Sequence, residues 1–175
     1  WQNNCIVVPV DAGSSAEDVI YILNDCRPGL IFTSADLFPR FQKILEKTLE
    51  KPEILVFEEL KPLTDAIVDD YELKPEPEKT AVIIYTSGTT GFPKGVMLSF
   101  ANLMANIRAV SKDVEIYTVD RQVLLLLPLH HIFPLAGSMM VTLYVGSTVV
   151  MSPTMQSSDL METFKNNKIS IVIGV

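Results

Sequence analysis

The sequence predicts an α/β fold, built on a layered, mainly parallel sheet with flanking helices. Two observations carry this expectation: short apolar, β-branched runs alternate with longer segments of helical periodicity, and several of those runs are apolar on both faces. Strands that alternate with helices favour parallel pairing, and strands buried on both faces are typical of parallel sheets. The 175 residues, 48% of them hydrophobic, suffice for the core of one domain.

The first 58 residues predict five elements in strand and helix alternation. They are a strand at 5–10, a helix at 15–26, a strand at 29–33, a helix at 35–50 and a strand at 53–57. Ser14 and Glu17 have the spacing of a capping box, in which two side chains satisfy the first backbone N–H groups of a helix. This pair predicts the start of the helix at 15–26.

A linker and a second group of elements follow. Residues 59–79 predict an irregular, extended linker, because Lys61-Pro62 and Lys74-Pro75 restrict the backbone before each proline. The expected later elements are strands at 80–85 and 95–99, a helix at 101–112, a strand at 122–127, a helix at 132–145, and strands at 147–151 and 169–174 with a helix between them. We expect one incomplete domain over 1–175, with parts at 1–58, 59–79 and 80–175, because the sequence begins without Met and ends in a strand-like run.

One apolar stretch is long enough to be compared with a membrane span. No Asp, Glu, Lys or Arg occurs from Gln122 to Ser158, and roughly 20 apolar residues can cross a bilayer. Pro134, Gly137 and Gly146 interrupt the stretch, however, and its second half is β-branched. It therefore predicts a buried helix followed by a buried parallel strand. A chain that exposes part of this surface is expected to self-associate.

Charge and cysteine content limit the function classes. There are 14 Lys and Arg against 21 Asp and Glu, an acidic balance that argues against a nucleic-acid partner. Cys5 and Cys26 are too few for a disulfide framework or a zinc site, so both are expected to be small buried hydrophobic residues. A reducing, cytoplasmic location agrees with this composition.

The most informative segment is 85–95, Tyr-Thr-Ser-Gly-Thr-Thr-Gly-Phe-Pro-Lys-Gly, which follows the apolar strand at 80–85. Ligands of open α/β sheets collect where strands end. Glycines that can take positive φ, hydroxyl side chains and one lysine are the donors that a polyphosphate requires. The segment therefore predicts a phosphate loop. Its expected phosphate-binding residues are Thr86, Ser87, Gly88, Thr89, Thr90, Gly91 and Lys94.

Two alternatives apply to this loop. Clusters of Ser, Thr and Gly are most often ordinary turns. A Walker A loop needs a Gly-Lys-Ser/Thr ending, whereas Lys94 lies between Pro93 and Gly95. The spacing thus excludes a P-loop NTPase, while composition alone leaves the ordinary turn open.

The order Thr-Ser-Gly-Thr-Thr-Gly-x-Pro-Lys-Gly, followed by Val96-Met97-Leu98-Ser99, closely resembles the signature of the adenylate-forming acyl-CoA synthetase and luciferase superfamily. The run from Leu127 to Phe133 looks like the family's Leu-Pro-Leu-x-His-x-Phe segment, and Val7-Val8-Pro9-Val10 resembles the strand before its first adenylate-domain helix. The likeness covers nearly the whole chain in outline and is strongest to a long-chain fatty acid–CoA ligase. It implies an internal part of the N-terminal domain of such an enzyme.

The resemblance implies ATP-dependent activation of a carboxylic acid, with a fatty acid as the expected substrate. In the family the loop holds the β- and γ-phosphates of ATP during attack on the α-phosphate. The implied ligands are ATP, Mg²⁺, for which Thr86 is the nearest candidate residue, and coenzyme A as co-substrate. Peripheral membrane association of the parent protein is a further expectation. The family's later catalytic motifs do not occur in this sequence, so we expect these 175 residues alone to lack adenylation activity.

The resemblance also implies a catalytic role for His131, which takes the family's histidine position near the acyl pocket. A neutral imidazole there can orient the reacting carboxylate. The residues alone leave another interpretation open, in which His130 and His131 are partly buried core residues. Phe100 and Pro134 stand where relatives often have histidine and glycine, and the second departure concerns the entrance of the acyl pocket.

Two other functions stay open at this point. One is an amino-acid-activating or acyl-carrier-protein ligase of the same superfamily, which differs in its acyl pocket. The other is a non-catalytic nucleotide-binding module, which would bind ATP without forming an adenylate.

Overall fold

The computed structural model describes residues 5–60, 76–87 and 92–174. The chain forms two compact units. Unit 1 comprises Trp1–Pro9, Pro75–Ile84 and Met97–Val175, and unit 2 comprises Val10–Lys74 and Tyr85–Val96. The boundary crosses the two strands that flank the phosphate loop, β3 (Thr80–Thr86) and β4 (Lys94–Ser99). The division of the sequence at residues 58 and 79 stays a prediction.

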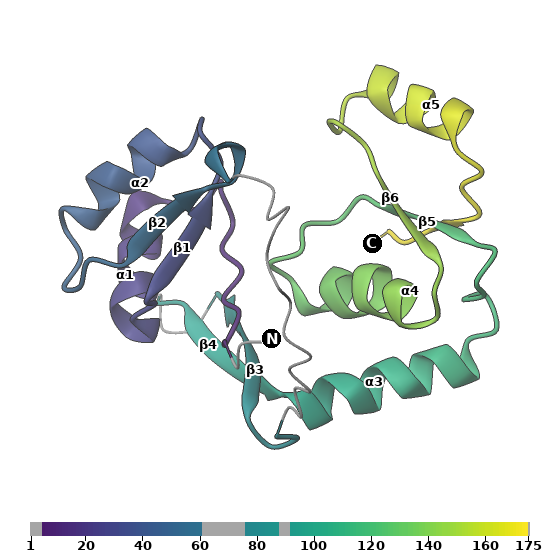
Figure 1. Ribbon diagram of the computed structural model, residues 1–175, viewed down its shortest axis with the longest axis horizontal. Helices are drawn as coiled ribbons and strands as arrows, with labels where there is room; N and C mark the ends of the chain where they lie inside the picture. Colours follow the sequence, from purple (N-terminus) through teal and green to yellow (C-terminus); the bar gives the residue numbers. More distant parts are fainter. Residues whose placement is uncertain (1–4, 61–75, 88–91, 175) are drawn as a thin grey trace. The chain divides into compact units, whose positions relative to one another are not determined.

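Unit 2 consists of a parallel pair of strands with two helices packed against it. Along the chain come α1 (Ala16–Cys26), β1 (Leu30–Thr33), α2 (Phe38–Leu45), β2 (Glu53–Val56) and a 3₁₀ turn, η1 (Phe57–Glu59). Strand β1 pairs in parallel with β2, and Figure 1 shows α1 and α2 beside them. The core joins Val19 and Leu23 of α1 to Ile44 and Leu45 of α2. The predicted order of these helices and strands is confirmed.

The cap of α1 lies one residue later than the sequence predicts. Ser15 is the N-cap, and its Oγ accepts a hydrogen bond of 3.1 Å from the backbone N–H of Asp18. The N–H of Ser14 instead donates to the carbonyl of Asp11 at 3.1 Å, so Ser14 belongs to the preceding turn. The predicted pair of Ser14 and Glu17 is therefore wrong, and Ser15 caps the helix.

Two predicted elements are shorter than expected. Helix α2 ends at Leu45 rather than near residue 50, because the Thr48 hydroxyl hydrogen-bonds to the carbonyls of Leu45 (2.9 Å) and Glu50 (2.8 Å) in a turn. The expected strand at 5–10 is reduced to one parallel bridge between Val7 and Val82. Side-chain hydrogen bonds and the pairing of distant strands thus shift the ends of the predicted helices and strands, but their order along the chain is as predicted.

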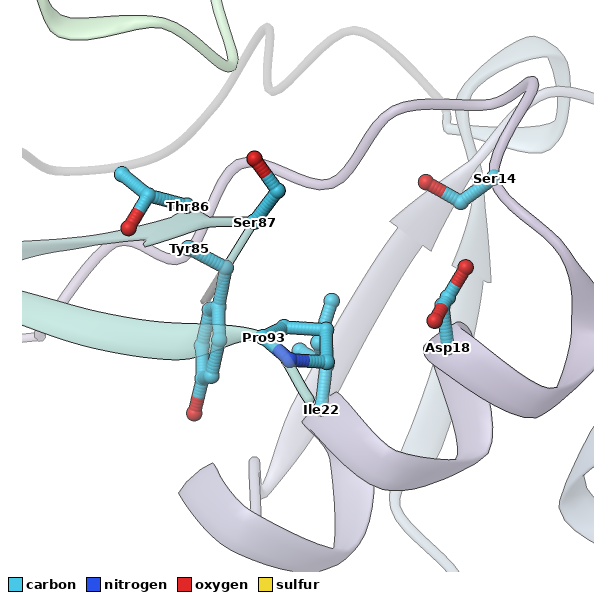
Figure 2. Close-up of a pocket in the computed structure, with 7 residues that line it drawn as sticks. All are labelled: Ser14, Asp18, Ile22, Tyr85, Thr86, Ser87 and Pro93. Atoms are coloured by element: carbon cyan, nitrogen blue, oxygen red, sulfur yellow. The ribbon is translucent and has the colours of Figure 1, made fainter. Parts of the chain in front are cut away.

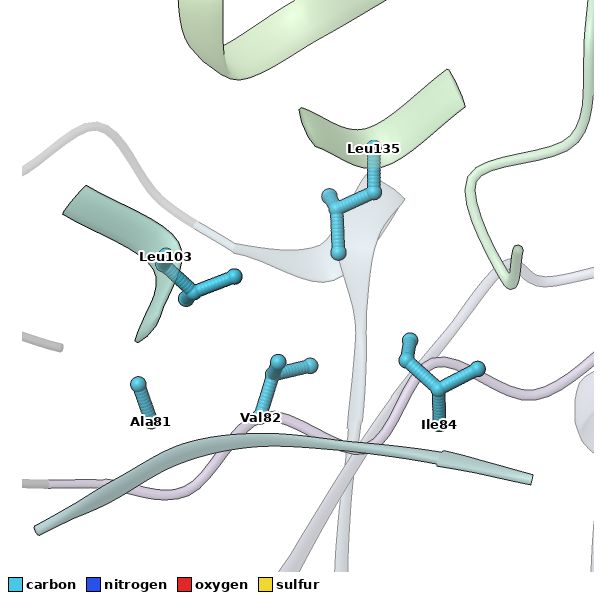
Figure 3. Packing of buried hydrophobic residues seen from close by; sticks show 5 residues of the cluster. All are labelled: Ala81, Val82, Ile84, Leu103 and Leu135. Atoms are coloured by element: carbon cyan, nitrogen blue, oxygen red, sulfur yellow. The ribbon is translucent and has the colours of Figure 1, made fainter. Parts of the chain in front are cut away.

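The core of unit 1 begins on β3, which pairs with β4. Ala81, Val82 and Ile84 of this strand are buried and pack with Leu103 and Leu135, as Figure 3 shows. Leu103 belongs to α3 (Phe100–Asp113), and Leu135 to a π-helical segment, η2 (Pro134–Met140). The strand that leads into the phosphate loop is therefore anchored by apolar contacts from two other elements.

A second sheet completes unit 1. It has three parallel strands in the order β6-β5-β7. They are β5 (Gln122–Leu125), β6 (Thr148–Met151) and β7 (Ile171–Val172), and α5 (Ser157–Asn166) connects the last two. The α/β class and the mainly parallel pairing are confirmed, although the strands of the described residues are divided among three short sheets.

The apolar stretch from Gln122 to Ser158 folds into unit 1. After β5 it forms η2 and then α4 (Val141–Tyr144), followed by β6. The predicted helix followed by a parallel strand is confirmed. Leu135, Val141 and Val150 are buried, but Leu143 at 59% and Met151 at 70% are exposed, so the helix and the strand are each buried on one side only. Within the residues described, no helix combines the length and apolar character needed to span a membrane.

The cysteines differ in exposure. Cys26 is half-buried at the end of α1, whereas Cys5 is exposed. The prediction of a buried Cys5 is wrong, because its segment forms only the single bridge at Val7 and not a central strand.

Candidate functional site

The phosphate loop connects two hydrogen-bonded neighbours, β3 and β4. The structure describes the two flanks of the loop, 85–87 and 92–95. Gly88, Thr89, Thr90 and Gly91 lie outside the described residues, so their contacts with phosphate stay predictions. The flanks are placed by strand pairing, and β3 is further held by its buried side chains.

A cavity of about 370 Å³ opens beside the first flank, within unit 2. It is lined by Ser14, Asp18, Ile22, Tyr85, Thr86, Ser87 and Pro93. In Figure 2, Thr86 and Ser87 lie on one side, and Ser14 and Asp18 on the other. The Thr86 and Ser87 side chains are exposed, so their hydroxyl groups are accessible to a ligand. Sites for small molecules span roughly 300–1,000 Å³, a range that includes this cavity.

Charge is distributed unevenly around this cavity. Lys94 is exposed at the start of β4 and belongs to the same unit, although it is not one of the lining residues. Asp18 brings a carboxylate, whose Oδ2 accepts a hydrogen bond of 2.8 Å from the Ser15 hydroxyl. Because like charges repel, a phosphate group is favoured on the Thr86 and Ser87 side rather than beside Asp18.

Tyr85, the first residue of the loop, contacts the end of α1. Its hydroxyl donates to Oδ2 of Asp25 at 2.6 Å. Burial, and then this hydrogen bond, raises the pKa of Tyr85, so the hydroxyl remains a donor at neutral pH. Burial likewise raises the pKa of the Cys26 thiol. The sequence pattern does not point to Asp25, because the two partners lie 60 positions apart.

Phe92, on the second flank, contacts the same helix. Its ring stacks on that of Tyr21 of α1, with centroids 5.3 Å apart and an interplanar angle of 23°. Phe92 occupies the x position of the loop motif, where sequence reasoning assigned no role. The sequence indicated this contact only through the two aromatic residues themselves, one in the loop and one in the predicted helix at 15–26.

His131 lies in unit 1, in the bend that leads from β5 to η2. Its N–H donates to the carbonyl of Pro128 at 3.3 Å, and its carbonyl accepts from the N–H of Leu135 at 3.2 Å. The imidazole of His131 is exposed, whereas His130 is half-buried, and the two rings have centroids 4.2 Å apart. Exposure makes His131 the histidine that is better able to meet a ligand.

The predicted site residues are therefore divided between the two units. Thr86 and Ser87 line one cavity, and Lys94 begins the strand that follows, all in unit 2. His131 belongs to unit 1. The role assigned to each of these residues stays a prediction.

A loop of this composition between paired strands, with hydroxyl groups at a cavity, suits a nucleotide-binding enzyme of the α/β class. Residues 1–175 match the model of the AMP-binding enzyme family, and the chain belongs to that family. The expected adenylate-forming superfamily is thereby confirmed.

Among the relatives is the mitochondrial malonate–CoA ligase of Homo sapiens, which is 30% identical over 177 residues. The match covers 96% of this chain but 29% of that relative. Another is a probable CoA ligase of Humulus lupulus, 29% identical over 172 residues, with 87% of this chain and 27% of that relative covered. The chain thus spans less than a third of the curated relatives it matches.

A solved structure gives the same result for the fold. ATP-bound MatB from Rhodopseudomonas palustris superposes with a TM-score of 0.75 over 97% of this chain and 34% of that one. Its sequence identity is 23%, so this likeness concerns the fold alone. The N-terminal domain architecture of adenylate-forming enzymes is confirmed for this chain.

Proposed function

We propose that this chain is part of an ATP-dependent, AMP-forming acid–thiol ligase. Such an enzyme converts a carboxylic acid into its coenzyme A thioester through an acyl-adenylate. The observation that carries the proposal is the phosphate loop, whose Thr86 and Ser87 line a cavity of about 370 Å³. Membership of the AMP-binding enzyme family and the CoA ligases among the relatives support the same reaction class.

The proposed chemistry has two steps. A carboxylate oxygen attacks the α-phosphorus of ATP, and the bond to the bridging oxygen breaks, which gives acyl-adenylate and pyrophosphate. The thiolate of coenzyme A then attacks the acyl carbon, and AMP leaves. Negative charge grows on the departing pyrophosphate in the first step, so donors aimed at its oxygens lower the barrier. We assign this role to the hydroxyl groups of Thr86 and Ser87 and to the ammonium group of Lys94.

Mg²⁺ fits this proposal as a partner of the nucleotide. The ion prefers oxygen ligands and usually keeps waters and substrate phosphates in its coordination sphere. The exposed hydroxyl of Thr86 is a suitable oxygen donor at the cavity. When bound, Mg²⁺ would neutralise phosphate charge, which adds to the effect of Lys94.

His131 is assigned to the acid rather than to ATP. Its exposed imidazole can donate a hydrogen bond to a carboxylate. The two residues that follow are apolar and partly exposed, Ile132 at 38% and Phe133 at 54%. A polar donor next to exposed apolar side chains suits a carboxylic acid with an aliphatic chain.

We favour a fatty acid over a short dicarboxylic acid. The segment around His131, from Gln122 to Ser158, contains no Lys or Arg, so it offers no ion pair to a second carboxylate. A charged group that is removed from water needs such a partner. Malonate remains the alternative, because it is the acid in the name of the human relative.

Exchange of labelled pyrophosphate into ATP tests this function in the full-length protein that contains this sequence. The expected result is exchange that depends on added fatty acid, with octanoate or palmitate as probes. Exchange with malonate alone would support the proposed reaction but identify malonate, not a fatty acid, as the substrate. Exchange with amino acids alone would favour an amino-acid-activating ligase. ATP binding without exchange for any acid would favour a nucleotide-binding module.

A further inference from the structure

We propose that α1 fixes both flanks of the phosphate loop, and that Asp25 and Tyr21 are positioning residues for the phosphate donors. The four residues that make these contacts, Tyr21, Asp25, Tyr85 and Phe92, are called the α1 clamp. The inference rests on the proposed function, because it concerns the reaction of ATP at this loop. All four residues belong to unit 2.

The first contact fixes the entry to the loop. The hydroxyl of Tyr85 donates to Oδ2 of Asp25 at 2.6 Å, a short distance that is typical of a hydrogen bond to a charged acceptor. Tyr85 is directly followed by Thr86 and Ser87. Restricting Tyr85 therefore restricts the backbone from which these two hydroxyl groups project.

The second contact fixes the exit from the loop. Phe92 is 62% exposed and Tyr21 is 36% exposed, so neither ring is held in a closed core. The stacked arrangement, with centroids 5.3 Å apart, is nevertheless the geometry in which aromatic pairs attract each other. Phe92 lies two residues before Lys94, so this contact restricts the backbone that carries the ammonium group.

Helix geometry explains how one element reaches both flanks. Tyr21 and Asp25 are four residues apart in α1, a spacing that puts two side chains on the same helix face. Ile22 lies between them and lines the cavity together with Tyr85 and Pro93; Figure 2 shows these three side chains close together. Apolar packing in the middle and two directed contacts at the sides give a defined position to both flanks.

Fixed flanks matter because catalysis of this kind depends on donors that are already in place. A group that must be ordered during the reaction stabilises the transition state less than one that is preorganised. The clamp residues bear no phosphate-binding group of their own in this assignment. They act through Thr86, Ser87 and Lys94.

The test measures the KM for ATP and the kcat of pyrophosphate exchange in the full-length protein. Asp25→Ala and Tyr21→Ala are each expected to raise the KM for ATP about threefold to tenfold, as expected for loss of one partly exposed contact. The KM for the acid should stay the same. Asp25→Asn keeps a hydrogen-bond acceptor and Tyr21→Phe keeps the ring, so the KM for ATP of both variants should be close to the wild-type value.

Tyr117→Phe is the matched control, because it also removes a hydroxyl hydrogen bond, of 2.9 Å to the carbonyl of Gly137 in unit 1. It should lower the melting temperature and leave the KM for ATP unchanged. If Asp25→Ala fails to fold, Tyr85→Phe removes the same hydrogen bond and decides the matter. If the wild-type protein is active and the clamp variants have an unchanged KM for ATP, the α1 clamp is overturned but the proposed function is not. Absence of exchange in wild type with every acid would instead overturn the proposed function, and the clamp with it.

Discussion

Among the described residues, Tyr117 of unit 1 and Tyr85 of unit 2 each donate a hydrogen bond from the phenol hydroxyl, in different surroundings. In unit 1, Tyr117 is buried and donates to the backbone carbonyl of Gly137 in a partly buried hydrogen bond. In unit 2, Tyr85 donates to the exposed carboxylate of Asp25 at the start of the phosphate loop. The same group thus stabilises a core in one unit and supports a candidate ligand site in the other.

The apolar cores of the described residues differ in extent, because unit 1 contains two clusters of buried residues and unit 2 contains one. In unit 1, Val82, Val123 and Val141 are fully buried. In unit 2, the described core is one cluster of Val19, Leu23, Ile44 and Leu45, with exposures from 1% to 8%, and the cavity opens beside Ile22. We infer that unit 1 depends mainly on packing, whereas unit 2 combines a smaller core with polar contacts that serve the loop.

Truncation of the unit 1 core should have the largest effect. Leu103 is 4% exposed in the cluster around β3, and Leu103→Ala should lower the free energy of unfolding by about 2–5 kcal/mol. Leu49→Ala is the matched control, because Leu49 is 76% exposed. Denaturant unfolding measures both. Equal losses for the two variants would contradict the packing account of unit 1.

The second-largest effect is expected when Lys94 of the phosphate loop is replaced. Lys94→Ala should lower the rate of pyrophosphate exchange roughly 100-fold, because it removes a positive charge from the phosphates, and the KM for the acid should not change. Lys112→Ala, on the exposed last turn of α3, should have no effect. If both lysine variants exchange pyrophosphate like wild type, Lys94 has no catalytic role.

His131→Ala tests the acid side in unit 1. We expect kcat/KM for the acid to fall about tenfold, the value for loss of one hydrogen bond of about 1.4 kcal/mol, with the KM for ATP unchanged. Steady-state kinetics with varied acid gives the answer. A larger fall in kcat/KM for the acid with His130→Ala would mean that His130, and not His131, has this role.

Each unit has a helix whose N-terminus is capped by a serine, so the same substitution can be compared in both units. The Ser99 hydroxyl caps α3 in a reciprocal capping box with Asn102, with distances of 3.2 and 3.1 Å, whereas Ser15 caps α1. Ser99→Ala and Ser15→Ala should each lower stability by about 1 kcal/mol. In addition, Ser15→Ala should raise the KM for ATP slightly, because α1 carries the clamp. A change in that KM for Ser99→Ala alone would reverse the comparison.

Alkaline pH should have the smallest effect near neutrality. The pKa values of Tyr85 and Tyr117 are raised from 10.0, by burial first in both cases. Their contribution to stability is therefore fully present below about pH 10, and is lost as the pH rises beyond it. Tyr85→Phe and Tyr117→Phe should each make the stability less dependent on pH above 10, as followed by denaturant unfolding. An unchanged slope in both variants would contradict the raised pKa values.

Local patterns predicted the fold class because they depend on near neighbours. Helix α1 and strand β3 follow from periodicity and apolar runs, whereas the role of the phosphate loop stays a prediction from its residue order. The cap at Ser15 was missed by one residue, because the turn that includes Ser14 competes for the same position. The early end of α2 was missed because the Thr48 side chain terminates it.

Contacts between distant residues were beyond the sequence pattern. The bond from Tyr85 to Asp25 and the stacking of Phe92 on Tyr21 depend on how α1 packs in unit 2. The exposure of Cys5 was missed for a related reason, since an apolar run forms a strand only where a partner strand is available. The candidate ligand-binding residues were thus accessible to sequence reasoning, whereas the residues of α1 that contact the flanks of the loop were not.

The most direct test of the central claim follows a carboxylate oxygen. The full-length protein is given a fatty acid labelled with ¹⁸O in its carboxylate, ATP, Mg²⁺ and coenzyme A, and the products are analysed by mass spectrometry. Attack on the α-phosphorus predicts AMP that carries one labelled oxygen, and unlabelled pyrophosphate. Label in inorganic phosphate, with ADP as the nucleotide product, would contradict the account.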